Sequence, residues 1–277
     1  MIAKVLEDSA TAIDLLLDKI YRASSHDFRK YRRGAIIRHL NRRLQATRTG
    51  TYIEYMRFLD AHPQEYQRLT DYLTIHVSSF FRNAYTFKQV ARLVLPELVS
   101  EKTRRGQRDL NFWSAACASG EEPYSIAIML AQYLGHSRRE FDISIHAIDI
   151  SRYVLDRAQA GNYRNTEGIT DDLLNDYFLH CDGGYKVRNG VRRMVKYSYF
   201  NLLSTKIQPL TGMDCIYCCN ILIYLQKQLQ DRVLNLLYSS LATPGYLVLG
   251  EAETLTDSLC GKLECLDARA KIYKKKV

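Results

Sequence analysis

Residues 110–130, LNFWSAACASGEEPYSIAIML, contain the strand-to-helix transition around which we expect the fold to be built. The stretch is apolar through Trp113, and residues 115–120 then have almost no side-chain bulk. Residues 121–123, EEP, suit a first helical turn, because acids favour its positive end and proline lacks the donor that this turn cannot use. The exposed N–H groups at such a helix start often hold a cofactor in α/β proteins. A plain strand–helix connection is the alternative, since one glycine is not a GxGxxG fingerprint.

The composition narrows the class of protein. The 277 residues suffice for one large domain or a small plus a medium one. No apolar run approaches the roughly 20 residues of a membrane span, and charges interrupt the N-terminal MIAKVLEDSA at once, unlike a secretion signal. Seven cysteines without a disulfide framework predict a reduced, cytoplasmic protein. The net charge of +9 indicates an acidic partner, which could be nucleic acid, anionic lipid or an acidic protein surface.

The first 75 or so residues have the apolar periodicity of helices. Within residues 28–53 there are eight Arg or Lys and no acid. Arg38 and Arg42 are four residues apart and therefore share a helix face. A solvated surface is the plain alternative, but a face of one sign costs self-repulsion, which favours a docking surface. Residues 52–73 predict a further pair of short helices, broken near Pro63.

An apolar and aromatic linker follows at residues 75–87, IHVSSFFRNAYTF. We expect Phe80 and Phe81 to be buried, which would bring Arg82 close to the core. A guanidinium there needs a partner. Arg82 would then either form a structural ion pair within the protein or reach a carboxylate in a pocket.

A second strand is expected at residues 143–150, followed by a helix over 151–160. Asp149 lies at the carboxyl end of this strand, where it can accept both hydroxyls of a nucleoside ribose. A helix N-cap is the rival role, although Ser151 can fill it. His146 is expected to pack within the strand.

The βα alternation does not continue from residue 161 to about 200, and residues 181–199 within this stretch contain the signals of a β element. Gly183-Gly184 and Asn189-Gly190 lie between short strand-like runs, and Asn-Gly is a hairpin signal. We predict a small antiparallel β-subdomain here. A core strand then ends at Asn220, a helix follows, and residues 259–275 predict a last strand pair. Three cysteines lie near Asn220, but they lack a second pair of ligands, so no metal site is expected.

Together these motifs resemble the CheR family of chemotaxis receptor methyltransferases, and the resemblance covers nearly the whole chain. The motifs that carry it are Arg42-Arg43-Leu44, TIHVSSFFRN (Thr74–Asn83), WSAACASGEEPYSIA (Trp113–Ala127), AIDIS (Ala147–Ser151), Phe200-Asn201-Leu202-Leu203, CNILIYL (Cys219–Leu225) and PGYLVLGEAE (Pro244–Glu253). The strings SFFR and GEEPYS, in this order, are specific to that family.

The resemblance implies an α/β fold of the class I S-adenosylmethionine methyltransferase type, with a doubly wound and mostly parallel sheet. An N-terminal all-α, receptor-docking domain would occupy residues 1–75, and the methyltransferase domain residues 76–277, with the β-subdomain inserted at about 180–199. The implied reaction transfers a methyl group from S-adenosylmethionine to receptor glutamates, giving methyl esters and S-adenosylhomocysteine without a metal.

The resemblance also implies site residues. Those expected to bind the cofactor are His76, Ser78, Arg82, Glu122, Asp149, Asn201, Leu202, Cys219 and Asn220. Two of them depart from the usual pattern, since the family often has Asn at His76 and usually has Arg at Cys219. The second departure removes a charge near the cofactor. Arg82 and Tyr224 would be catalytic and lie nearest the methyl transfer.

The implied partner is the acidic helical methylation region of the receptors, which would meet Arg38, Arg42 and Arg43. The segment between Leu179 and Val187 is short, as in family members that do without a receptor tethering peptide. We therefore expect no binding of that peptide, no nucleic-acid substrate and no membrane insertion.

Two rival functions remain. The first is methylation of RNA or DNA, which the positive charge permits, but the aromatic-plus-Pro signature of nucleobase methylation is replaced by CNILIYL. The second is an inactive adaptor that binds cofactor and only docks on receptors. Cys219 and His76 permit this, whereas Arg82, Asn220 and Tyr224 argue against it.

Overall fold

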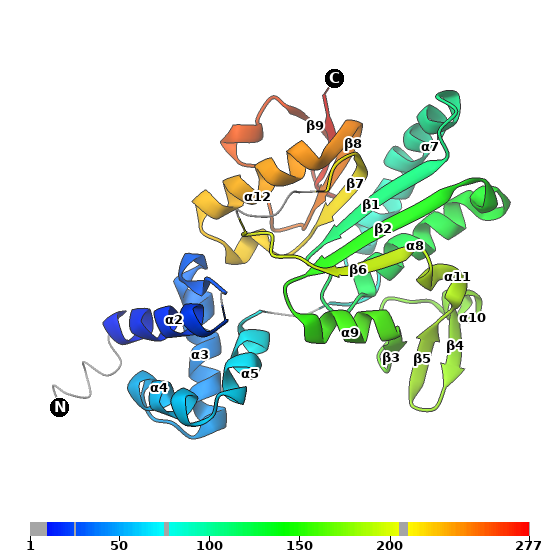
Figure 1. Ribbon diagram of the computed structural model, residues 1–277. Helices are drawn as coiled ribbons and strands as arrows, with labels where there is room; N and C mark the ends of the chain where they lie inside the picture. The colour runs from blue at the N-terminus through cyan, green and yellow to red at the C-terminus, as the bar shows by residue number, and fades with distance from the viewer. Residues whose placement is uncertain (1–9, 25, 75–77, 205–209, 277) are drawn as a thin grey trace. The chain divides into compact units, whose positions relative to one another are not determined.

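The computed structural model describes residues 10–24, 26–74, 78–204 and 210–276 (Figure 1). The chain divides into two compact units. Unit 1 comprises Met1–His76 and Tyr224–Leu229, and unit 2 comprises Val77–Ile223 and Gln230–Val277. Among the described residues, no helix combines the length and apolar character needed to cross a bilayer.

Unit 1 is helical. Its helices are α2 (Ala10–Ser24), the 3-10 turn η1 (Phe28–Lys30), α3 (Arg33–Thr47), α4 (Tyr52–Ala61) and α5 (Gln64–Leu73). Apolar residues at helical spacing form its core, including Leu16, Leu40 and Leu69, none of which is exposed. The predicted helical region and its break near Pro63 are confirmed.

A segment from the C-terminal half of the chain belongs to unit 1. The Arg32 N–H donates to the Tyr224 carbonyl at 2.8 Å, and the Gln226 N–H donates to the Lys30 carbonyl at 3.2 Å. Tyr31 and Leu225 form an antiparallel bridge between them. The main chain of Lys30 and Arg32 therefore holds the main chain of Tyr224 and Gln226. The position of the Tyr224 backbone does not depend on its phenol.

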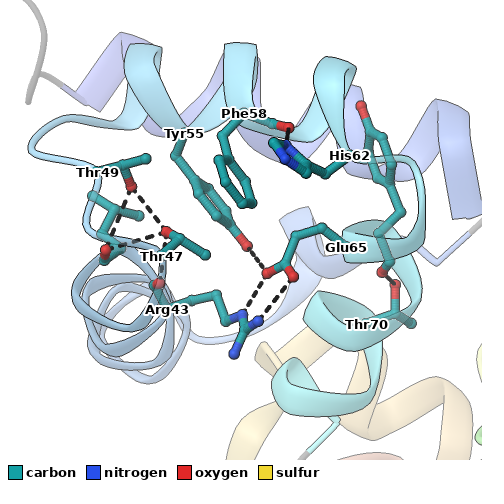
Figure 2. A network of polar contacts seen from close by, with 10 residues as sticks. Arg43, Thr47, Thr49, Tyr55, Phe58, His62, Glu65 and Thr70 are labelled. Carbon is teal, nitrogen blue, oxygen red and sulfur yellow. Dashed lines mark hydrogen bonds and ion pairs between the residues drawn. The ribbon is translucent and has the colours of Figure 1, made fainter.

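A buried carboxylate connects three helices of unit 1 (Figure 2). Glu65 on α5 is 2% exposed and accepts two hydrogen bonds from the Arg43 guanidinium of α3, at 2.5 and 2.8 Å. The Tyr55 hydroxyl of α4 donates to the same carboxylate at 2.9 Å. Burial raises the pKa of Glu65, but hydrogen bonds from Arg43 and Tyr55 outweigh it and leave this pKa below its usual value.

The three arginines expected to dock a receptor therefore differ in environment. Arg38 and Arg42 are exposed on α3, whereas Arg43 is mostly covered and bound to Glu65. The sequence alone did not predict this internal contact of Arg43. It favours a structural role for Arg43 and leaves Arg38 and Arg42 as the accessible charges of that helix.

Unit 2 contains a seven-stranded sheet in the order β6-β2-β1-β7-β8-β10-β9. The strands are β1 (Asp109–Ala115), β2 (Asp142–Asp149), β6 (Val195–Tyr199), β7 (Met213–Cys218), β8 (Leu241–Leu249), β9 (Leu263–Asp267) and β10 (Ile272–Lys275). The pairs from β6 through β8 are parallel, and β10 is antiparallel to both of its neighbours. This is the doubly wound, mostly parallel sheet that the sequence predicts.

Helices precede β1 and connect the strands that follow it (Figure 1). They are α6 (Ala84–Gln89), the π-helical η2 (Val90–Val94), α7 (Leu95–Arg104), α8 (Glu121–Leu134), η3 (Gly135–Glu140), α9 (Arg152–Ala160), α10 (Asp171–Tyr177), α11 (Asn189–Arg192), η4 (Leu222–Tyr224), α12 (Lys227–Ser240) and η5 (Asp257–Leu259). The chain runs outward from β1 in one direction through α8 and α9, and outward from β7 in the other direction through α12. Crossovers between parallel strands are right-handed. The two sets of helices therefore cover opposite faces of the sheet.

The small antiparallel sheet differs from its predicted position. It consists of β3 (Asn162–Tyr163), β5 (Gly184–Val187) and β4 (Phe178–Cys181), in that order. The hairpin predicted at Asn189-Gly190 is wrong, because α11 occupies these residues, and the following strand β6 pairs with β2 of the large sheet. The insert predicted at about 180–199 is thus displaced toward the N-terminus. The Asn-Gly signal is local, whereas the strand that follows it pairs with the distant edge of β2.

The Arg43–Glu65 pair yields a stability prediction. We expect Arg43→Ala to lower the free energy of unfolding by about 3 kcal/mol, because it leaves a buried carboxylate without its cation. Arg42→Ala, one residue away on the exposed face, should change it by less than about 0.5 kcal/mol. Urea unfolding of the two variants measures this difference. Equal unfolding midpoints would contradict the structural role of Arg43.

Candidate functional site

The strand order places a reversal of the winding next to the carboxyl end of β1. The connections from β1 to β2 and from β7 to β8 run in opposite directions across the sheet, so β1 and β7 flank the point where the winding reverses. Ligands of doubly wound sheets bind outside the carboxyl ends of the strands at this point. The residues that follow β1, β2, β6, β7 and β8 are therefore those to consider (Figure 1).

The turn after β1 has an unusual backbone. Ala116 and Ala118 have φ values of +61° and +48°, in the left-handed region that favours glycine. The Cys117 N–H donates to the Ile148 carbonyl at 2.8 Å, which holds the turn against β2. Helix α8 then starts directly after Gly120. Small side chains in this conformation let a ligand approach the backbone closely.

Asp149 fixes the same turn from β2. Its side chain is buried, with Oδ2 accepting from the Ala118 N–H at 3.0 Å and Oδ1 from the Ser151 N–H at 2.9 Å. The Ser151 hydroxyl accepts from the Val154 N–H, so Ser151 is the N-cap of α9, as expected. These two contacts tie the Asp149 carboxylate to the turn after β1 and to the start of α9.

Glu122, in the first turn of α8, is a carboxyl group whose pKa lies near neutral pH. Burial raises its pKa to about 7, although hydrogen bonds from Ser114 and Cys219 and the charge of Arg82 act in the opposite direction. The Ser114 hydroxyl donates to its Oε1 at 2.6 Å. The negative charge of Glu253 raises the pKa of Glu122 further. A carboxylate in this state can change protonation as a ligand binds.

Four further residues expected at the cofactor lie at the ends of β6 and β7. Asn201 and Leu202 follow β6, where the Asn201 side chain accepts from the Leu203 N–H and Leu202 is 6% exposed. Asn220 follows β7 with φ at +62°. The preceding Cys219 has its thiol pKa raised well above the usual value by burial and by the neighbouring carboxylates.

The remaining expected residues are placed differently. Arg82 is exposed, not drawn into the core, because Phe81 adopts a φ of +47° that turns the chain after the buried Phe80. Ser78 is half-buried, and His76 lies outside the described residues. Tyr224 ends η4 and belongs to unit 1, whereas Arg82 belongs to unit 2. Their joint catalytic role stays a prediction.

Sequence reasoning assigned no role to Glu253, which the structure places at the same edge. It is 2% exposed, and its carboxylate accepts from the backbone N–H groups of Asn220, Leu222 and Gly250. The only signal in the sequence was its position in the PGYLVLGEAE string. Across the described ranges, no three His, Cys, Asp or Glu side chains gather in a way that could hold a metal ion.

The start of α8 yields a second prediction. A Cβ at Gly120 would lie 2.8 to 2.9 Å from Ala158 Cβ and from the hydroxyls of Tyr163 and Tyr197. Gly106 shares a positive φ, but a Cβ there would meet nothing within 4 Å. Gly120→Ala should therefore cost about 1–3 kcal/mol more stability than Gly106→Ala, because only the first adds overpacking to backbone strain. Urea unfolding tests this, and equal losses would contradict the crowding.

Comparison with known proteins agrees with this geometry. Residues 76–272 match the family model described as "CheR methyltransferase, SAM binding domain". Residues 11–74 match the model described as "CheR methyltransferase, all-alpha domain". The two matches together cover most of the chain.

Curated relatives extend the match. The chain is 32% identical over 244 residues to chemotaxis protein methyltransferase 2 of Pseudomonas aeruginosa, covering 85% of this chain and 84% of that protein. It is 32% identical over 209 residues to a chemotaxis protein methyltransferase of Borreliella burgdorferi, covering 74% of each. A chemotaxis protein methyltransferase of Salmonella typhimurium is 30% identical over 246 residues, covering 86% of this chain and 82% of that protein. With its fold, the switch point at the carboxyl ends of its parallel strands and both domain matches, the chain belongs to the CheR family of S-adenosylmethionine-dependent methyltransferases.

Proposed function

We propose that this protein transfers the methyl group of S-adenosylmethionine to glutamate side chains in the acidic helical methylation region of chemotaxis receptors. The products would be glutamate methyl esters and S-adenosylhomocysteine. The observation that supports this most strongly is the turn Ala116–Gly120, closed by Asp149 at the switch point of the sheet in a chain of the CheR family. We also propose a cytoplasmic location, which the seven free cysteines support.

The residues present fit this cofactor. The alanines of the turn leave its backbone open to a close-lying ligand, and Asp149, at the carboxyl end of β2, is the residue proposed to accept the two ribose hydroxyls. Glu122, in its ionised form, can accept hydrogen bonds from the cationic amino group of the methionine part. Asn201, Leu202, Asn220 and Cys219, at the neighbouring strand ends, and Ser78 and His76, before the first helix of unit 2, complete the proposed cofactor residues.

The reaction needs little acid–base chemistry from the protein. The cofactor supplies an electrophilic methyl group on a sulfonium, which a carboxylate oxygen can attack in line while the carbon–sulfur bond breaks. A glutamate has an unperturbed pKa near 4.3, so the nucleophile is already ionised at neutral pH and no general base is required. The work of the protein is to align the reacting atoms, which supplies part of the roughly 7–11 kcal/mol available from positioning.

Arg82 and Tyr224 are the residues that we propose for this alignment. An exposed guanidinium at Arg82 can meet an incoming carboxylate, and its charge already acts on Glu122. The Tyr224 backbone is fixed by Arg32, which leaves its hydroxyl available for a separate task. Arg82 could instead bind the carboxylate of the cofactor, and measurements of affinity and turnover separate the two roles.

Two substitutions test the catalytic assignment. We expect Arg82→Ala and Tyr224→Phe each to lower turnover at least about tenfold, because positioned polar groups typically supply that much. Labelled S-adenosylmethionine and a receptor fragment measure turnover, and calorimetry measures affinity for S-adenosylhomocysteine. Arg92→Ala and Tyr153→Phe, both on exposed side chains, are the controls. If both site variants keep wild-type turnover, the catalytic assignment is wrong, and label transfer to RNA would support the nucleic-acid alternative.

The proposed receptor surface is the exposed face of α3. Arg38 and Arg42 lie four residues apart on it, and an acidic helical bundle is the complementary surface. The loop between β4 and β5 consists of only Asp182 and Gly183, which supports a form of the enzyme that binds no receptor tethering peptide. Neither nucleic acid nor a membrane is needed as a partner.

This docking surface predicts a salt-dependent reaction. Raising the salt concentration above about 0.1 M, where the Debye length is about 10 Å, should lower kcat/KM steeply. Arg38→Glu combined with Arg42→Glu should lower kcat/KM at low salt and flatten its salt dependence, because the attraction is then removed. Arg57→Glu, on the exposed side of α4, is the matched control. A wild-type rate that is insensitive to salt would exclude docking through α3.

A further inference from the structure

Glu253 is a buried carboxylate whose contacts are all of one kind. Its Oε2 accepts from the Asn220 N–H at 2.9 Å and the Gly250 N–H at 2.8 Å, and its Oε1 accepts from the Leu222 N–H at 2.6 Å. Burial raises the pKa of Glu253, and the hydrogen bonds from backbone N–H groups oppose that shift. Backbone dipoles thus compensate the buried carboxylate, in contrast to Glu65, which is held by an arginine.

These contacts join the carboxyl ends of two adjacent parallel strands. Gly250 directly follows β8, and Asn220 follows β7. A Cβ at Gly250 would lie 2.8 Å from Glu253 Oε2 and 2.9 Å from the Asn220 nitrogen. Glycine at this position therefore lets the carboxylate reach both strand ends at once. The turn that it holds is strained, since Asn220 has φ at +62°.

The same carboxylate acts electrostatically on the cofactor side of the edge. Glu122 is flanked by Ser114 and Cys219, which donate hydrogen bonds to it, by the positive charge of Arg82 and by the negative charge of Glu253. Glu253 thus acts on two proposed cofactor residues in different ways. It fixes the backbone of Asn220, and it makes ionisation of Glu122 less favourable.

We propose that Glu253 is a positioning residue of the methyl-transfer site. Its carboxylate holds the backbone of Asn220–Leu222 in the conformation that directs the Asn220 side chain toward the cofactor. This inference rests on the proposed function for the identity of the cofactor. A role limited to joining β7 and β8 is the alternative, and it predicts a loss of stability without a selective loss of binding.

Glu253→Gln tests the proposal with little change in shape. The Gln side chain has one carbonyl oxygen, and its amide NH₂ cannot accept the hydrogen bond that the second carboxylate oxygen received. We expect the affinity for S-adenosylhomocysteine to fall about tenfold or more, as for the loss of one hydrogen bond to a charged group. Calorimetry on the full chain measures affinity, and thermal unfolding of the same samples measures stability. Glu251→Gln, an exposed carboxylate two residues away, is the matched control.

The pH profile supplies a readout that a purely structural role would not move. In the wild type, burial raises the pKa of Glu122 to about 7, so affinity for S-adenosylhomocysteine, whose protonated amino group is the proposed partner of Glu122, should rise as the pH increases through that value. Removing the negative charge of Glu253 lowers the pKa of Glu122. The rise in affinity should therefore move to lower pH in Glu253→Gln and stay in place in Glu251→Gln.

The outcomes separate the alternatives. Wild-type affinity and an unmoved pH profile in Glu253→Gln would overturn the proposal, whatever happens to its stability. If this variant does not fold, Glu253→Asp carries the test, because it keeps the charge but shortens the reach to the three N–H groups. Wild-type affinity in that variant would also overturn the proposal. If the wild type binds S-adenosylhomocysteine but methylates no receptor, the proposed function fails while the test of Glu253 on affinity stands.

Discussion

The hydrogen bond from the Ala118 N–H to the Asp149 carboxylate joins the turn after β1 to the end of the neighbouring strand β2. It holds two alanines in a conformation that favours glycine, and α8 begins directly after this turn. The strand order places the turn at the switch point, so the same contact serves both the fold and the cofactor site. The other proposed cofactor residues that follow strands lie at the ends of the neighbouring strands β6 and β7. They are Asn201, Leu202, Cys219 and Asn220.

In both units, buried carboxylates connect separate helices or strands, but their hydrogen-bond partners differ. Asp149 and Glu253 are held by backbone N–H groups at the strand ends, where parallel strands leave donors without partners in the sheet. Glu65 is held by Arg43 and Tyr55 between helices. Burial raises the pKa of Glu122, and the negative charge of Glu253 raises it further. The Glu65 carboxylate is instead paired with the guanidinium of Arg43.

Much of the fold could be predicted because its signals are local or periodic. Helical spacing predicted the helices of unit 1, and small residues followed by acids predicted the turn before α8. The errors arose where a distant partner decides the structure. Val195–Tyr199 pairs with the edge of β2 and does not form a hairpin at Asn189. The chain turns at Phe81, whose φ is positive, and Arg82 is exposed. The roles of Arg43 and Glu253 depend on partners 22 and 31 to 33 residues away, which no local pattern indicates.

Amide hydrogen exchange of the full chain, with and without S-adenosylhomocysteine, tests the location of the cofactor site most directly. The structure predicts slower exchange on binding in peptides that cover residues 114–122, 147–151 and 217–223, which contain the ends of β1, β2 and β7. Peptides from the opposite ends of these strands should be unaffected. Protection confined to those opposite ends or to α2–α5, with no change at 114–122, would contradict the account.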